Sequence, residues 1–301
     1  MKTLRQDQLR AQSRQIEAAL EAAVSGAALS APPRLGAALR DAVFPGGARV
    51  RARLCLAVAA ACGDDCPRAS TAAAVAIELL HCGSLVHDDL PCFDNAALRR
   101  GKPTVHVAHG EPLAVLAGDA LIVLAMETLV RGTAQVPHRL PSVLATICAA
   151  TGMPHGIIAG QAWESEKLVA LSEYHRAKTA ALFVAATVAG ALTAGASATR
   201  WGGLGERLGE AYQVADDLRD VAQDASAMGK PAGQDAALGR PSAAAEMGPR
   251  RALAHFESLV QAATDAIPDC NGAEHLRLLI RMEALRLVPP EMARELSRRA
   301  A

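Results

Sequence analysis

The chain has 301 residues, enough for one large domain or two small ones. Apolar residues make up 51% of it and aromatic residues only 3%, and much of the apolar content is alanine, the strongest helix former. Lysine plus arginine and aspartate plus glutamate balance at 31 each, so no basic surplus indicates nucleic-acid binding. Seven cysteines without a CxxC pair favour free thiols in a reducing, cytoplasmic compartment.

The helical period dominates, and no convincing alternating strand is present. Residues 4–24 predict an amphipathic helix, with Gly/Pro-rich joints at 31–33 and 44–47. Six further apolar helices are expected at residues 50–62, 68–89, 112–131, 142–160, 172–194 and 202–223. A loop over 228–241 and two or three closing helices, broken at Pro289–Pro290, complete the chain.

Two absences shape the expected organisation. The N-terminus lacks an apolar signal core, and no window reaches about 18 apolar residues free of charge, so neither a signal peptide nor a membrane span is expected. There is also no tandem repeat and no linker long enough to separate domains. The sequence therefore predicts a single all-α domain over residues 1–301, with roughly a dozen helices.

Two of the apolar helices end in clusters of carboxylates. These clusters are Asp88, Asp89 and Asp94, and Asp216, Asp217 and Asp220. A single pair such as Asp64–Asp65 is usually a solvated turn, but two clusters that each close an apolar helix need relief from charge repulsion and desolvation. A shared divalent cation is the simplest relief. Mg²⁺ prefers carboxylate oxygens and usually takes substrate phosphates as its remaining ligands.

The spacing within each cluster predicts how the carboxylates are arranged. Asp216 and Asp220 are four residues apart and share a helix face, whereas Asp217 points aside and can support them by hydrogen bonding. Asp88 and Asp94 would not share a face on a regular helix. Pro91 lacks an N–H and tends to end a helix, so the chain can curl and bring Asp94 back beside Asp88.

Basic residues accompany both clusters. Arginine binds phosphate bidentately and lysine supplies a point charge. The candidate phosphate-binding residues are Arg49, Arg51, Arg99, Arg100, Lys178 and Lys230. Together with the two acidic clusters they suggest two polyphosphate sites, one rich in metal and one mainly basic.

Seven ordered blocks of sequence resemble the trans-polyprenyl diphosphate synthases, most strongly over about residues 35–240. They are residues 45–51, 81–91 and 98–104, Gly118–Asp119 with Gly160–Gln161, Lys178–Thr179, and 212–220. The resemblance is closest to the short-chain branch that makes geranylgeranyl diphosphate for bacterial carotenoid and bacteriochlorophyll pathways. It implies an all-helical fold around a deep central cavity, a homodimer, and a transferase of isoprenoid biosynthesis that joins isopentenyl diphosphate to an allylic diphosphate.

The resemblance also implies roles for single residues. About three Mg²⁺ ions would bind Asp88, Asp94 and Asp216, with Asp89, Asp217 and Asp220 in support. The allylic diphosphate would contact Arg99, Lys178 and Lys230. Isopentenyl diphosphate would contact Arg51, His81 and Arg100, and Thr179 and Gln213 would present oxygens to the allylic cation. The family usually has lysine where this chain has Ala48, whose side chain adds no charge; whether the adjacent Arg49 compensates is left open by the sequence.

Product length is expected to depend on the residues that precede Asp88. A helix rises about 5.4 Å per turn, close to the length of one extended isoprene unit. Gly83 and Ser84, one turn back, are small, whereas Leu80, two turns back, is bulky. This spacing predicts geranylgeranyl diphosphate (C20) as the main product, with close helix packing as the other explanation of Gly83 and Ser84.

Four other functions remain to be distinguished. A farnesyl diphosphate synthase would stop at C15. A class I terpene cyclase usually has a mixed Asn/Ser/Glu second motif and many aromatic residues, neither of which is present. A non-catalytic subunit of a heteromeric synthase often lacks one acidic cluster. A di-iron carboxylate bundle needs two ExxH motifs, and only Glu78–His81 is found.

Overall fold

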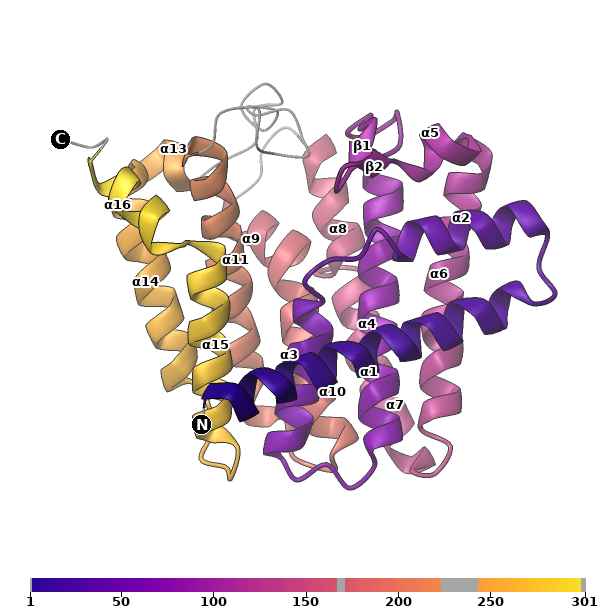
Figure 1. The fold of residues 1–301 in the computed structure, drawn as a ribbon, viewed down its shortest axis with the longest axis horizontal. Coiled ribbons are helices and arrows are strands. Elements are labelled where there is room, and N and C mark those ends of the chain that lie inside the picture. The colour runs from indigo at the N-terminus through magenta and orange to yellow at the C-terminus, as the bar shows by residue number, and fades with distance from the viewer. Residues whose placement is uncertain (1, 167–170, 223–242, 299–301) are drawn as a thin grey trace. The chain divides into compact units, whose positions relative to one another are not determined.

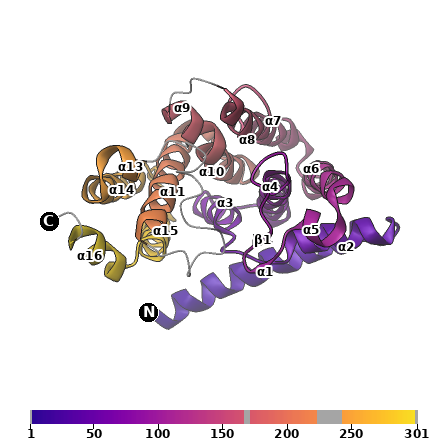
Figure 2. The ribbon, with the colours of Figure 1, turned by 90° about the horizontal axis from the view of Figure 1, so that it is seen from above.

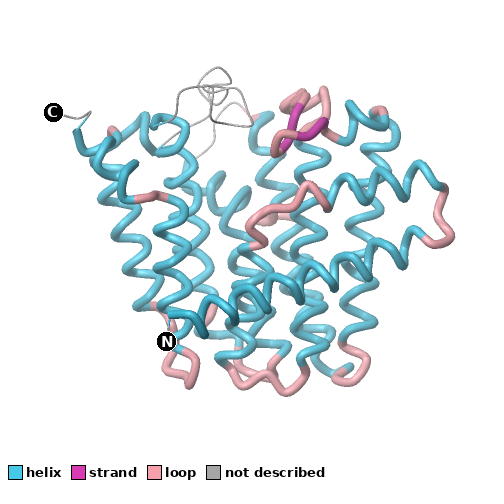
Figure 3. Tube along the Cα trace, in the orientation of Figure 1, coloured by secondary structure: helices cyan, strands magenta, loops and turns pink. Residues whose placement is uncertain are grey.

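The structure, a computed structural model, describes residues 2–166, 171–222 and 243–298. These residues are almost entirely helical (Figure 3), which confirms the predicted all-α class. A short antiparallel hairpin is the exception, with β1 (Leu98–Arg99) paired to β2 (Lys102–Pro103). Two compact units can be separated, Met1–Cys148 with Ala186–Ala198, and Ala149–Ala185 with Thr199–Ala301. The single domain over residues 1–301 stays a prediction.

The first unit is built around one buried helix. Its helices are α1 (Lys2–Ala28), α2 (Pro33–Val43), α3 (Val50–Ala61), α4 (Pro67–Asp88), α5 (Val105–His109), α6 (Glu111–Gly132), the first part of α7 (Leu140–Thr151) and the part of α10 (Ala181–Thr193) from Ala186 onward. Helix α4 packs between α3 and α6, and α1 and α2 lie along one side of this layer (Figures 1 and 2). The alanine-rich face of α4 lets its neighbours approach closely.

Small residues set the distance between α4 and α6. A Cβ added at Gly132 of α6 would overlap the side chain of Ala72 and lie 3.2 Å from the carbonyl oxygen of Arg68. Near the other end of the pair, a Cβ at Gly83 of α4 would lie 3.2 Å from the carbonyl oxygen of Gly118. The backbones of the two helices therefore run close together along their whole contact.

The second unit contains the remaining helices. These are α8 (Ile157–Ala162), α9 (Leu171–His175), a π-helical turn (Arg176–Ala180), α10 (Ala181–Thr193) up to Ala185, α11 (Gly202–Ala222), α13 (Ala243–Met247), α14 (Pro249–Asp265), α15 (Ala273–Leu287) and α16 (Pro290–Arg298). Short 3₁₀ turns lie at Pro137–Arg139, Trp163–Ser165 and Ala198–Arg200.

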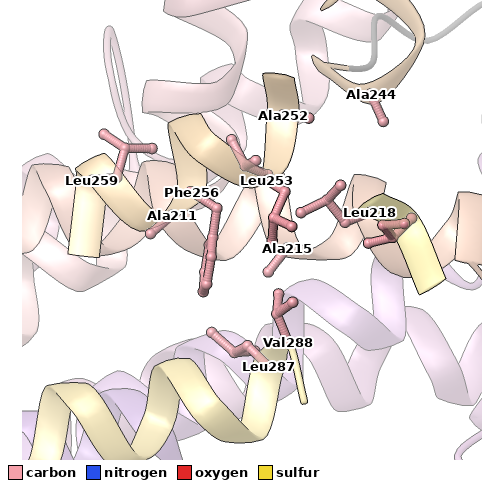
Figure 4. Packing of buried hydrophobic residues seen from close by; sticks show 12 residues of the cluster. Ala211, Ala215, Leu218, Ala244, Ala252, Leu253, Phe256, Leu259, Leu287 and Val288 are labelled. Carbon is pink, nitrogen blue, oxygen red and sulfur yellow. The ribbon is translucent and has the colours of Figure 1, made fainter. Parts of the chain in front are cut away.

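Helix α11 is anchored in this unit by one apolar face. Ala211, Ala215 and Leu218 recur at helical spacing and point toward Leu253 and Phe256 of α14 (Figure 4). The end of α15 packs against the same cluster. Because this face is fixed, the polar residues on the rest of α11 have defined directions.

The structure corrects several sequence-based boundaries. The hairpin and helices α2 and α5 were not predicted, and the expected helix at 142–160 is broken into α7 and α8. The predicted loop at 228–241 lies outside the described residues. The predicted break at Pro289–Pro290 is confirmed, since α15 ends at Leu287 and α16 begins at Pro290. All seven cysteines are free thiols.

Two described helices are long and apolar enough to span a membrane by composition alone. They are α4 and α6, and 78% of the apolar window in α4 and 39% of that in α6 is buried inside the protein. The buried core helix of a soluble protein satisfies the same criterion, so this is weak support for a span.

Candidate active site

The first aspartate cluster lies where α4 ends. Asp88 is the last helical residue, and the chain then turns through Leu90 and Pro91. The backbone N–H of Asp94 donates to the carbonyl oxygen of Asp88 at 3.0 Å. The curl predicted from Pro91 is therefore confirmed: it brings Asp94 back beside Asp88.

Arg99 of β1 lies against this cluster. Its Nε donates to the carboxylate oxygens of Asp89 at 3.0 and 3.2 Å, and Nη2 lies 3.7 Å from Asp88 Oδ2. Desolvation opposes the charged guanidinium, but hydrogen bonds to Asp89 and the charges of Asp89, Asp88 and Asp94 raise the pKa of Arg99 above its ordinary value. Buried Asp89 thus orients Arg99 beside the two expected metal ligands.

The carboxylates of each unit are of the type that Mg²⁺ binds. Asp88 and Asp94 offer carboxylate oxygens at one turn, and Asp216 and Asp220 offer others on one face of α11. Within the described residues no three acidic, histidine or cysteine side chains form a ready-made metal cage. Mg²⁺ usually binds through one or two carboxylates plus substrate phosphates, and the role of these aspartates as metal ligands stays a prediction.

A basic site lies beside α3 in the same unit. Arg51 Nη1 is 3.3 Å from His81 Nε2, which joins α3 to α4. Burial, then the positive charges of Arg51, Arg100, Arg99 and Arg49, hold the pKa of His81 well below its ordinary value. His81 is therefore neutral near pH 7, so one of its ring nitrogens carries a proton that it can donate to an anion.

Arg100 reaches this site over a glycine turn. Arg100 and Gly101 both have positive φ (55° and 75°), as a two-residue hairpin turn requires. The guanidinium of Arg100 lies over the backbone of Gly47, where an added Cβ would be 2.6 Å from Arg100 Cζ. Desolvation is the largest influence on Arg100 and lowers its pKa, and the nearby Arg49 and Arg99 act in the same direction. Because other positive charges surround the Arg100 guanidinium, an anionic ligand would bind favourably there.

Arg49 differs from its expected role. It is buried at 4% exposure, and its guanidinium donates to Glu17 Oε1 at 2.8 Å, to Glu78 Oε1 at 3.0 Å and to the carbonyl oxygen of Val43 at 2.7 Å. These contacts bind α3 to α1 and α4. Because its donors point at protein oxygens, Arg49 does not compensate for Ala48, whose side chain is exposed beside it.

The Gly118–Asp119 motif supports the end of α4. His87 Nε2 lies 3.2 Å from the carbonyl oxygen of Val115 and 3.7 Å from Asp119 Oδ1. A Cβ at Gly118 would be 2.6 Å from His87 Cε1, so only glycine leaves room for the ring. The motif therefore lets His87, the residue before Asp88, pack against α6.

Of the three expected chain-length residues, Gly83 is placed differently from its expected role. A Cβ at Gly83 would contact the Gly118 carbonyl oxygen at 3.2 Å and Leu121 Cβ at 3.4 Å, so this position faces α6. Its small size is explained by helix packing. Ser84 is half-buried and donates to the carbonyl oxygen of His81 at 2.8 Å, and Leu80 is buried.

In the second unit, a π-helical turn carries Lys178 and Thr179. Two glycines let neighbouring helices approach it: a Cβ at Gly160 of α8 would lie 2.8 Å from the carbonyl carbon of Ala177, and one at Gly209 of α11 would lie 3.1 Å from the backbone nitrogen of Ala180. Single π-turns often mark functional sites. The first of these contacts explains the glycine of the Gly160–Gln161 motif.

Thr179 is joined to α11 by a short relay. Thr179 Oγ1 donates to Gln213 Oε1 at 2.8 Å, and Gln213 Nε2 donates to Asp217 Oδ1 at 3.1 Å. Asp217 is buried and accepts this bond from Gln213, whereas its expected support of Asp216 and Asp220 stays a prediction. The relay fixes the amide of Gln213 and places its oxygen beside the Thr179 hydroxyl.

Asp216, the expected metal ligand of the second cluster, is more exposed than Asp217. The side chain of Asp216 is 53% exposed and pairs with Arg219, three residues along α11. Lys178 pairs with Glu164, which is not among the site residues expected from the sequence. No pattern in the sequence indicates this pair, because the two residues are 14 positions apart on different helical segments. Lys230 lies outside the described residues.

Comparisons with known proteins identify the family of the chain. The polyprenyl synthetase family model matches residues 32–265. The chain is 54% identical to a geranylgeranyl diphosphate synthase of Cereibacter sphaeroides over 92% of this chain and 97% of that one. It is 51% identical to one of Rhodobacter capsulatus over 91% and 96% of the two chains.

A solved structure gives the same fold. The geranyltransferase of Helicobacter pylori, complexed with magnesium and isoprenyl diphosphate, matches with a TM-score of 0.78 and 29% identity over 92% of this chain and 97% of that one. The resemblance recognised in the sequence is therefore confirmed. The chain belongs to the polyprenyl synthetase family and is a trans-prenyltransferase.

Proposed function

We propose that the chain condenses isopentenyl diphosphate with an allylic diphosphate and releases geranylgeranyl diphosphate as its main product. One observation carries the proposal: two relatives that are more than 50% identical over nearly the whole chain are named for this product. The intact acidic clusters and the basic site at Arg51, His81 and Arg100 support it.

We assign the allylic diphosphate to the acidic clusters together with Arg99, Lys178 and Lys230. Bound Mg²⁺, about three ions per site, would neutralise the departing pyrophosphate. The residues expected to hold these ions are Asp88, Asp94 and Asp216, with Asp89, Asp217 and Asp220 in support. Arg99 and Lys178 add fixed positive charge where the leaving group develops its negative charge.

Thr179 and Gln213 would stabilise the positive charge left on the allylic carbon. Their hydrogen bond holds two oxygens together at the π-turn, and Asp217 fixes the amide that completes the relay. Apolar side chains around them would exclude water, which would otherwise trap the cation as an alcohol. No protein nucleophile is required.

Isopentenyl diphosphate would bind at Arg51, His81 and Arg100. Arg51 and Arg100 supply charge, and neutral His81 supplies a donor. The double bond of isopentenyl diphosphate attacks the allylic carbon, and the proton lost from the adduct passes to the released pyrophosphate. We leave Arg49 out of this set because its guanidinium is bound to Glu17 and Glu78.

We further propose a homodimer in which α6 of one copy covers α6 of the other. Val115, Leu116, Val123 and Val130 are 42–57% exposed, and they follow one side of this helix. An exposed apolar stripe of this kind marks an interaction surface, and a second copy of the chain is the simplest occupant. Replacing Val123 with glutamate should give monomers in sedimentation experiments. The cytoplasmic location stays a prediction.

The proposed function is tested by product analysis of the purified chain. It is incubated with Mg²⁺, isopentenyl diphosphate and an allylic primer of five, ten or fifteen carbons, and the products are separated by chromatography. A C20 diphosphate is expected from each primer. A C15 end product would indicate a farnesyl diphosphate synthase, a cyclic hydrocarbon would indicate a cyclase, and no turnover by the chain alone would indicate a non-catalytic subunit.

A further inference from the structure

One carboxylate in the second unit receives three side-chain hydrogen bonds. Tyr174 Oη donates to Glu164 Oε1 at 2.6 Å, and Gln161 Nε2 donates to Glu164 Oε2 at 3.0 Å. Lys178 Nζ donates to Glu164 Oε1 in a close ion pair. The side chains of Glu164 and Lys178 are only 16% and 24% exposed, so water screens this pair weakly.

The backbone holds both members of the pair in place. Glu164 lies in the 3₁₀ turn Trp163–Ser165 that directly follows α8, and Gly160 packs α8 against the π-turn that carries Lys178. The ring of Tyr174, whose hydroxyl binds the same carboxylate oxygen as Lys178, lies 5.6 Å from Lys178 Nζ. The ammonium group therefore has both a carboxylate and an aromatic ring as neighbours.

We propose that Glu164 is a positioning residue that holds Lys178 before substrate binds and competes with the diphosphate for its ammonium group. This inference rests on the proposed function, which assigns Lys178 to the allylic diphosphate. A lysine has three N–H donors, so Lys178 can exchange one partner without leaving its position. When pyrophosphate leaves, Glu164 takes the ammonium group back.

The competition predicts the direction in which the affinity for a diphosphate changes when Glu164 is replaced. Part of the attraction between Lys178 and a diphosphate is offset by the loss of its interaction with Glu164, so the carboxylate weakens the binding of substrate and of pyrophosphate product. Removing the negative charge of Glu164 should therefore strengthen the binding of the substrate and of pyrophosphate. It should also slow turnover, because Lys178 loses its fixed position and pyrophosphate is released more slowly.

The test is Glu164→Gln, which keeps the shape and the hydrogen-bonding capacity of the side chain but removes its charge. We expect the dissociation constant of pyrophosphate, measured by calorimetry with Mg²⁺, to fall about three- to tenfold, the range for a partly exposed charged pair. KM for the allylic substrate should fall with it, and kcat should fall as well. An unchanged or weaker affinity for pyrophosphate overturns the proposal.

Two further variants separate charge from structure. Tyr174→Phe removes one hydrogen bond to the same carboxylate but keeps its charge, so the pyrophosphate dissociation constant should stay within about twofold. Glu164→Asp keeps the charge and moves it by one methylene, so the pyrophosphate affinity should not increase and kcat should fall. If all three variants shift the affinity equally, Glu164 has only a structural role.

The result can be distinguished from a failure of the proposed function. Lys178→Gln combined with Glu164→Gln should bind pyrophosphate as weakly as Lys178→Gln alone, because the gain requires the ammonium group. If Glu164→Gln still tightens pyrophosphate binding when Lys178 is also replaced, the inference is overturned. If the wild-type chain does not elongate allylic primers, the proposed function fails, whereas calorimetry still reports whether Glu164 restrains Lys178.

Discussion

Gly47 and Arg100 offer a sharp test of the isopentenyl diphosphate site. Arg100 lies over the Gly47 backbone, and its guanidinium occupies the space that a Cβ would fill. Removing Arg100 would remove a charge-assisted hydrogen bond of about 1.5–3 kcal/mol. Arg100→Ala should therefore raise KM for isopentenyl diphosphate about 10- to 150-fold, with little change in KM for the allylic substrate.

Gly47→Ala should reproduce this effect without removing any charge. The new Cβ would lie 2.6 Å from Arg100 Cζ, so the guanidinium must move away from its position over the turn. We expect KM for isopentenyl diphosphate to rise about tenfold. The double variant should resemble Arg100→Ala alone, because both changes remove the same interaction.

Gly46→Ala is the matched control. Gly46 also has positive φ (79°), so alanine introduces backbone strain there too, but no atom lies within 4 Å of the added Cβ. This variant should lose some stability and keep its KM for isopentenyl diphosphate. The reasoning is refuted if Gly47→Ala leaves KM for isopentenyl diphosphate unchanged, or if Gly46→Ala raises that KM by the same factor. It is also refuted if either variant changes KM for the allylic substrate.

Three further predictions follow from the two clusters and the basic site. Asp88→Ala or Asp216→Ala should lower turnover at least about a thousandfold while circular dichroism shows an intact fold, and near-wild-type turnover would exclude the metal role. Ala48→Lys should lower KM for isopentenyl diphosphate in steady-state assays, because the exposed Ala48 lies next to the turn beneath Arg100; an effect confined to the allylic substrate would place this turn at the other site. The pKa of His81 is lowered, so below an unfolded-state pKa of about 6.5 the unfolded chain binds a proton that the folded chain does not, and stability falls as the pH drops. His81→Gln should therefore reduce the loss of unfolding free energy between about pH 7 and pH 5.5 by about 1 kcal/mol in urea titrations, and an equal loss in both proteins would contradict this assignment.

Local chemistry made parts of the site predictable. The curl after Asp88 follows from one proline, and the direction of Asp217 follows from helix periodicity, so both could be predicted without knowing the rest of the fold. The glycine motifs were recognised as blocks. What each glycine allows, such as the ring of His87 beside Gly118, depends on which helices are neighbours.

Long-range partners could not be predicted in the same way. Arg49 lies two residues after Gly47 and two before Arg51, and this sequence favoured a phosphate contact. Its actual partners Glu17 and Glu78 are 32 and 29 residues away, and only the packing of α1 and α4 against α3 brings them together. A guanidinium binds the nearest available oxyanion, and the sequence alone does not show which one that is.

Helix geometry also changes the prediction for product length. At 3.6 residues per turn, Ser84 lies about 40° around α4 from Asp88, whereas Gly83 lies about 140° away, on the side that packs against α6. Contacts at Ala72 and Gly83 confirm which side faces α6. A chain that extends from Asp88 along its own side of α4 would therefore pass Ser84 before it reaches the bulkier residues near Leu80.

Ser84→Phe should accordingly shorten the product to C15 or below, and Leu80→Ala should lengthen it beyond C20. Gly83→Phe should act mainly on stability, because its ring would have to displace the backbone of α6, and overpacking of a core typically costs about 1–3 kcal/mol. Product chromatography and thermal unfolding of the three variants separate these effects. If Gly83→Phe shortens the product in a stably folded protein while Ser84→Phe still makes C20, the growing chain does not follow the Asp88 side of α4, and the physical basis for assigning C20 from this helix is lost.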